Sequence, residues 1–128
     1  MRKIQLLSIT IVLLLVSFIS NAQTGNQAKV QAYYFHNATR CMTCKTVEAE
    51  AKTDLKELYG DKVSFQALNL EDKATQEIAK KLKVSGQTLL VVKNDKQVYL
   101  TNEGFLYAVT NPEKFKTIIK EKVDPLVN

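Results

Sequence analysis

The sequence has 128 residues, of which 18 are Lys or Arg and 13 are Asp or Glu, and its net charge of +5 is spread along the chain. This length fits one domain with a single core, and the charge is too weak and too dispersed to indicate nucleic-acid binding. The chain has 2 cysteines and 1 histidine, which excludes the full ligand set of a closed structural zinc site.

The first residues have the order of a secretory signal peptide. Residues 1–3 are a short basic head, residues 4–19 carry no charge, and small residues lead up to Ala22. The apolar run is shorter than the ~20 residues that a membrane-spanning helix needs. We therefore predict a signal peptide at 1–22, cleaved after Ala22, and a mature domain at 23–128. The mature protein is then periplasmic or secreted, without a stable membrane anchor.

Apolar spacing and β-forming residues divide the mature chain into strands and helices that alternate at first. The last two strands are separated only by the turn residues Asn94 and Asp95. Residues 102–110 are predicted to be irregular. The predicted elements, in chain order, are a strand at 29–35, a helix at 41–59, a strand at 63–70, a helix at 71–82, strands at 88–92 and 97–101, and a helix at 111–123.

Capping residues set the ends of the predicted helices. Thr39 is the expected N-cap of the first helix, and Gly60 ends it. Asn111 caps the last helix, with Pro112 in its first turn. Residues 124–125, an Asp-Pro pair, are expected to stop that helix.

The element order β-α-β-α-β-β-α predicts the fold class. A helical crossover between the first two strands implies parallel pairing, and the short turn between the last two implies an antiparallel hairpin. We therefore predict an α/β fold, with a mixed four-stranded sheet that has helices on both faces.

The Cys41-Met42-Thr43-Cys44 stretch lies where the predicted first helix begins. A bridge that closes so short a loop stabilises a fold little, so reactivity or metal binding is the better reason for the pair. Helix N-terminal N–H groups and the helix dipole favour a thiolate at Cys41, and Arg40 and Lys45 add positive potential. Cys44 lies one turn further on, so we predict Cys41 as the nucleophile and Cys44 as the resolving thiol.

A second function remains open from the same residues. Two thiolates could instead hold a soft ion such as Cu(I), which would make Cys41 and Cys44 the ligands of a metal-binding module. Thiol–disulfide exchange needs no dissociable cofactor, and no glycine-rich motif for flavin or nicotinamide phosphates occurs in the sequence. We predict no cofactor, a protein thiol or disulfide as partner, no nucleic-acid partner, and a monomer.

The chain resembles the thioredoxin family over nearly all of residues 23–128. Two stretches carry the likeness: residues 33–35 with residues 40–45, and residues 84–95, which look like the loop, strand and turn that face the cysteine pair in thioredoxins. The stretch from Phe35 to Cys44 also resembles short exported thioredoxin-like proteins, the ArsF-type subunit of a nitrophenyl-compound nitroreductase. The resemblance implies a thioredoxin-like fold and an exported thiol-disulfide oxidoreductase, or an accessory redox subunit.

Three positions depart from the thioredoxin pattern. Arg40 stands where a tryptophan usually precedes the first cysteine, Phe35 stands at the buried acid, and Gln87 stands at the cis-proline. Because a cis bond before a residue other than proline costs ~2.5–4 kcal/mol, the bond between Gly86 and Gln87 is expected to be trans. The departures favour an unusual redox partner or a metal-binding pair over a general protein disulfide reductase.

Four side chains around the pair are candidate supporting residues, of which Arg40 is the first. His36 could pair with the thiolate or move a proton, or simply end the strand. Glu48 lies on the helix face of the cysteines and could replace the missing acid as proton acceptor, or be a solvated glutamate. Gln87 could donate its amide to a sulfur, or fill a loop. Tyr33 and Tyr34 are interpreted as sheet residues.

Overall fold

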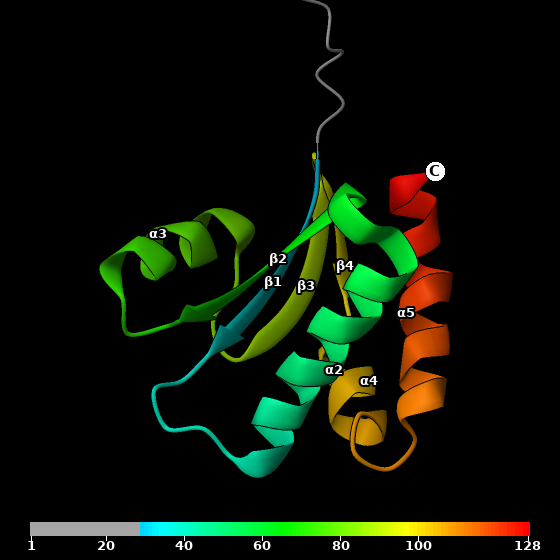
Figure 1. The fold of residues 1–128 in the computed structure, drawn as a ribbon. Helices are drawn as coiled ribbons and strands as arrows, with labels where there is room; N and C mark the ends of the chain where they lie inside the picture. Colours follow the sequence, from blue (N-terminus) through cyan, green and yellow to red (C-terminus); the bar gives the residue numbers. More distant parts are fainter. Residues whose placement is uncertain (1–28) are drawn as a thin grey trace, which may run out of the picture.

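The computed structural model describes residues 29–128, so the predicted signal peptide and its cleavage site lie outside the described residues. Strands and helices alternate through the first half of the described chain, and two helices follow the last strand (Figure 1). The elements are β1 (Val30–His36), α2 (Met42–Tyr59), the 3-10 turn η1 (Gly60–Lys62), β2 (Val63–Asn69), α3 (Lys73–Leu82), β3 (Thr88–Lys93), β4 (Lys96–Tyr99), α4 (Thr101–Tyr107) and α5 (Pro112–Val127).

The four strands form one mixed sheet in the order β2-β1-β3-β4. β1 runs parallel to β2 and antiparallel to β3, and β3 and β4 form the predicted antiparallel hairpin. Helix α3 covers one face of the sheet, and α2, α4 and α5 lie on the other (Figure 1). The predicted fold class, an α/β fold with a mixed four-stranded sheet and helices on both faces (Figure 1), is confirmed.

The core lies between the sheet and the helices α2 and α5, which cover one face of it. Alternate residues of β1 point into it, and both helices contribute apolar residues three and four positions apart, the spacing that keeps them on one face. The fully buried side chains of this core include Tyr34, Val47, Leu55, Leu89, Phe115 and Ile119. Burial of a side chain of this size stabilises a fold by about 1.5–3 kcal/mol.

One predicted segment is wrong, because residues 102–110 are not irregular throughout. Residues Thr101–Tyr107 form helix α4, which packs on α2 through Gly104. A Cβ added at Gly104 would lie 2.8 Å from Cγ1 of Val47. The glycine lowers the helix propensity of this stretch, but it also allows the close approach. Tertiary packing, not propensity, therefore accounts for this helix.

A second boundary is also wrong, because α5 does not stop at residues 124–125. It continues through Pro125 to Val127, and the N–H of Asn128 donates to the carbonyl of Asp124 at 3.1 Å. Leu126 is buried in the core, so the last turn is held by packing although proline supplies no N–H. The remaining predicted element ends differ from the structure by at most two residues.

Within residues 29–128, no helix combines the length and the apolar character that crossing a membrane requires.

Candidate functional site

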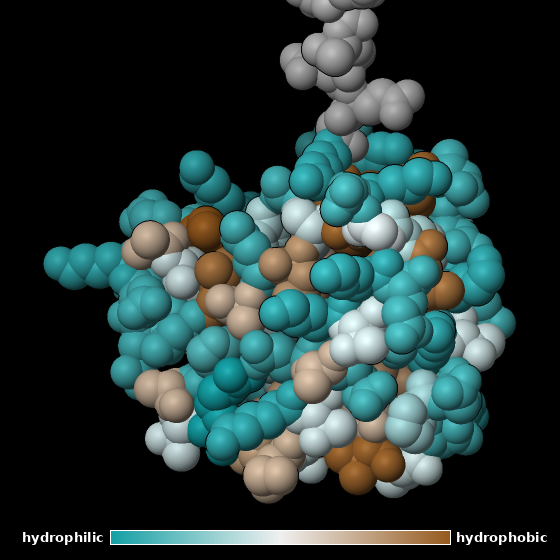
Figure 2. All heavy atoms as spheres, viewed as in Figure 1, coloured by the Kyte–Doolittle hydropathy of each residue, from teal (hydrophilic) through white to brown (hydrophobic). Residues whose placement is uncertain are grey.

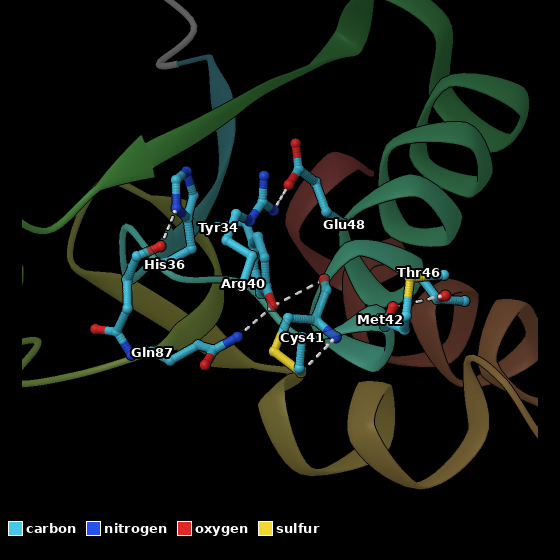
Figure 3. Close-up of a disulfide and its surroundings, with 10 residues drawn as sticks. Tyr34, His36, Arg40, Cys41, Met42, Thr46, Glu48 and Gln87 are labelled. Carbon is cyan, nitrogen blue, oxygen red and sulfur yellow. Dashed lines mark hydrogen bonds and ion pairs between the residues drawn. A yellow bond between two sulfur atoms is a disulfide. The ribbon is translucent and has the colours of Figure 1, made fainter.

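Cys41 and Cys44 form a disulfide at the first turn of α2 (Figure 3). Cys41 is the N-cap residue of this helix, and its Sγ accepts a hydrogen bond from the backbone N–H of Cys44 at 3.1 Å. The prediction of Thr39 as the N-cap is wrong, because the sulfur of Cys41 takes the place of a capping oxygen. The pair thus lies at a helix N-terminus, where N–H groups and the dipole favour negative charge on Sγ.

The two cysteines differ in their access to solvent. Cys41 is exposed, whereas Cys44 is only 8% exposed and belongs to the buried face of α2. Cys41 is therefore the more accessible residue of the pair for a reaction partner. This asymmetry is the one that a nucleophile and a resolving thiol require.

Tyr34 of β1 is a sheet residue, as expected, but its hydroxyl also belongs to the site. Its side chain is fully buried, and its hydroxyl donates to the backbone carbonyl of Cys44 at 3.1 Å. The same hydroxyl accepts a hydrogen bond from Nε2 of Gln87 at 2.6 Å (Figure 3). The signal was present in the sequence: alternation places Tyr34 on the face of Ala32, and a buried hydroxyl needs a partner.

Arg40 and Glu48 form an ion pair beside the disulfide (Figure 3). Both side chains are 22% exposed, and the guanidinium of Arg40 lies 5.9 Å from the centre of the Tyr34 ring. Arg40 was expected to add positive potential at Cys41, and Glu48 to accept a proton. In the structure each of these side chains is instead engaged by the other.

The other two candidate residues lie as follows. Nδ1 of His36 is 2.9 Å from the backbone carbonyl oxygen of Asn37, and the ring points away from the sulfurs (Figure 3). Gln87 donates its amide to Tyr34 and not to a sulfur. The bond between Gly86 and Gln87 is trans, as expected, and the described residues contain no cis peptide.

The described residues offer few ligands for a metal ion. Within 29–128, no group of three or more His, Cys, Asp or Glu side chains is arranged so that it could hold one. A soft ion would thus have to be held by the sulfurs of Cys41 and Cys44, as the predicted alternative assumes.

Several exposed apolar side chains lie at the end of the molecule that carries the disulfide (Figure 2). Met42, the neighbour of the exposed cysteine, is 77% exposed, and α4 with the residues after it adds Phe105, Leu106 and Val109 as exposed apolar side chains. Figure 2 shows apolar side chains at the end of the molecule where α2 begins and α4 lies. Exposed apolar side chains gathered on one region mark surfaces that contact other proteins.

No protein-family model matches the sequence, and no curated protein matches it either. Solved structures do match. Thioredoxin f2 of Chlamydomonas reinhardtii is 19% identical, with 76% of this chain and 82% of that one covered and a TM-score of 0.46. A thioredoxin from Thermus thermophilus is 16% identical, with 76% and 79% covered and a TM-score of 0.44.

A thioredoxin-like protein from Clostridium perfringens is 16% identical, with 73% of this chain and 79% of that one covered and a TM-score of 0.44. Likenesses at these identities and TM-scores carry no argument about activity. The chemistry of the site therefore has to follow from the chain's own residues.

Proposed function

We propose that this protein is a thiol-disulfide oxidoreductase that exchanges electrons with a protein thiol or disulfide through Cys41 and Cys44. The observation that supports this most strongly is the asymmetry of the bridge. Cys41 is exposed at the N-terminus of α2, while Cys44 is buried one turn later and linked to it. A short-loop bridge of this kind stabilises a fold little, so its placement suits reactivity.

The oxidised pair accepts electrons in two steps. A partner thiolate attacks Sγ of Cys41, the bond between Cys41 and Cys44 breaks, and Cys44 leaves as a thiolate that takes up a proton. A second partner thiolate then attacks the partner sulfur of the mixed disulfide, and Cys41 leaves. The partner is now oxidised to a disulfide, and the pair has gained two electrons as a dithiol.

The same residues run the reaction in reverse, in which Cys41 attacks a partner disulfide and Cys44 closes the bridge. In both directions Cys41 must be stable as a thiolate. The N–H of Cys44, 3.1 Å from Sγ of Cys41, supplies a hydrogen bond to that charge, and the start of α2 supplies the positive end of a dipole.

Variants of the two cysteines test this proposal. In reduction of insulin by dithiothreitol, the full chain should accelerate the reaction and Cys41→Ser should abolish the effect. Cys44→Ser should still attack, but it should stall as a mixed disulfide that mass spectrometry detects. A wild-type chain without any effect, or a fully active Cys41→Ser variant, would contradict the proposal.

We further propose that the protein acts outside the cytoplasm, because the predicted signal at 1–22 would carry it to compartments where disulfides persist. Mass spectrometry of the protein made in an exporting host tests this. A mature chain that begins at Gln23 supports export, and a chain that retains residues 1–22 contradicts cleavage after Ala22.

Two narrower alternatives use the same pair. A soft-metal module is favoured by Gln87, because the proline that helps keep metals from the sulfurs in the thioredoxin family is absent. One Cu(I) bound per reduced chain, together with no exchange activity, would favour the metal-binding module over the oxidoreductase. An accessory subunit of the ArsF type would instead use the pair to pass electrons to a partner enzyme, and that assignment rests on the sequence resemblance.

A further inference from the structure

We propose that Tyr34 is a positioning residue for the exchange reaction, whose hydroxyl holds the backbone of Cys44 and the amide of Gln87 together. In this role it keeps the resolving cysteine where its sulfur can close the bridge to Cys41. The inference rests on the proposed function, which makes Cys44 the resolving thiol.

The hydroxyl of Tyr34 is the point at which three parts of the fold meet. It belongs to β1, it donates to the carbonyl of Cys44 in α2, and it accepts from Gln87 in the loop before β3. The backbone of Tyr34 pairs with Ala67 of β2 on one side and with Leu89 of β3 on the other. Tyr34 therefore lies on a central strand that is held on both sides. Its hydroxyl has a fixed position relative to the two groups it binds.

The bond to the carbonyl of Cys44 needs the hydroxyl in its protonated form, because the hydroxyl is the donor there. Burial raises the pKa of Tyr34, against the opposing effects of the hydrogen bond from Gln87 and the charge of Arg40. The group therefore stays a donor throughout the range in which thiols ionise. Arg40, which is paired with Glu48, lies over the same ring, 5.9 Å from its centre.

Cys44 is thus held through both of its backbone polar groups. Its N–H donates to Sγ of Cys41, and its carbonyl accepts from Tyr34. Loss of the hydroxyl leaves the carbonyl side without this anchor, so the effective concentration of the Cys44 thiol toward Cys41 falls. The dithiol then becomes more favourable relative to the disulfide, by about threefold to tenfold, the size expected for one net hydrogen bond.

Equilibration of the full chain with glutathione redox buffers measures this effect. Tyr34→Phe should shift the equilibrium toward the dithiol by about threefold to tenfold, and a tenfold shift is ~30 mV for a two-electron couple. Tyr33→Phe is the matched control, because its hydroxyl bonds the side chain of Gln31 on the same strand. Its equilibrium should stay within about twofold of wild type.

A second variant separates positioning from a general loss of stability. Gln87→Leu removes the other hydrogen bond of the hydroxyl from a half-buried loop position, and it should shift the equilibrium in the same direction. The combined variant with Tyr34→Phe should shift it by less than the product of the two single effects. An equilibrium of Tyr34→Phe equal to that of Tyr33→Phe, whatever the change in melting temperature, overturns the inference.

The same experiments distinguish this inference from the proposed function. If the wild-type chain does not catalyse insulin reduction, the proposed function is wrong, although the equilibrium of the Cys41–Cys44 disulfide can still be measured. If the wild-type chain is active and the Tyr34→Phe variant has an unchanged equilibrium, only the proposed role of Tyr34 is wrong.

Discussion

Glu48 and Asp54 are carboxylates of helix α2 with little exposure, and their surroundings differ. Glu48, near the disulfide, is ion-paired with Arg40. Asp54, in the middle of the helix, is 5% exposed, and its Oδ2 has no hydrogen-bond partner among the residues that the structure describes. The carboxylate near the disulfide has a charged partner in contact with it, whereas the one in the middle of the helix has an oxygen without a hydrogen-bond partner among the described residues.

The surroundings of Asp54 explain why its ionised form lowers the stability of the fold. Desolvation by burial, with the charge of Glu50 added to it, raises the pKa of Asp54 to about 6. Lys116 of α5 opposes the shift, and Glu57 and Glu113 add to it. A buried carboxyl in this position is easier to accommodate neutral than charged. The contrast with Glu48 shows that one carboxylate of α2 has a directly bound cation and the other does not.

The largest expected effect comes from this unpaired acid. Because the pKa of Asp54 is higher in the folded chain than its ordinary value of 3.8, the folded state binds more protons between about pH 4 and 6. The contribution of Asp54 to the free energy of unfolding should therefore be highest below pH 4. It should fall as the pH rises to 6 and above. At ~1.4 kcal/mol per pKa unit, the loss is about 3 kcal/mol.

Urea unfolding of the wild type and of Asp54→Asn at pH 4 and pH 7 measures this. Asp54→Asn should lose most of the decline, because its side chain does not ionise. The difference between the two chains isolates Asp54 from other acids, such as Glu103, whose pKa is lowered and whose effect has the opposite sign. Asp61→Asn, at an exposed position, should keep the wild-type decline. An equal decline in Asp54→Asn would show that Asp54 is compensated.

An intermediate effect is expected where α4 meets α2 at Val47. Gly104→Ala would place a Cβ 2.8 Å from Cγ1 of Val47 and 3.4 Å from Cζ of Phe115. Val47 is β-branched and has one preferred rotamer in a helix, so it cannot turn away easily. Overpacking costs about 1–3 kcal/mol, and the better helix propensity of alanine returns up to ~1 kcal/mol. When the full gain is realised, the net loss of unfolding free energy should be about 0–2 kcal/mol.

Gly86→Ala is the matched control, since a Cβ there meets nothing within 4 Å. Its unfolding free energy should stay close to that of wild type. Val47→Ala should relieve the clash, so the combined variant with Gly104→Ala should be less destabilised than the sum of the two changes. Simple additivity would mean that α4 does not press on α2 at this point.

The smallest effect is expected for the ion pair near the disulfide. A double-mutant cycle of Arg40→Ala and Glu48→Ala should give a coupling of about 0.5–1 kcal/mol, since both side chains are partly exposed and water screens the pair. The coupling should fall at high salt. No coupling at low salt would remove the contrast drawn with Asp54.

Much of the fold follows from local pattern. The three-and-four spacing of Val47, Ala51 and Leu55 predicts the buried face of α2, and the β-forming run of β3 predicts a buried strand. Helix α4 could not be predicted in this way, because it depends on the contact of Gly104 with Val47, far away in the sequence. Local propensity holds no information about such packing.

The candidate site shows the same division. The position of Cys41 and Cys44 at a helix start follows from the sequence. The partners of Gln87 and Glu48 do not, because Gln87 meets Tyr34 across 53 positions of the chain. Buried polar side chains must find hydrogen-bond partners, but which partner each one finds is decided by the tertiary fold.

The central claim is that Cys41 is the accessible nucleophile and Cys44 the sheltered thiol that resolves. Iodoacetamide labelling of the fully reduced chain across pH, with the modified cysteine identified by mass spectrometry, tests it most directly. Cys41 should be labelled first, with a midpoint below the ~8.5 of a free thiol, and Cys44 should follow slowly. Faster labelling of Cys44, or equal rates at both cysteines with a free-thiol midpoint, would contradict the account.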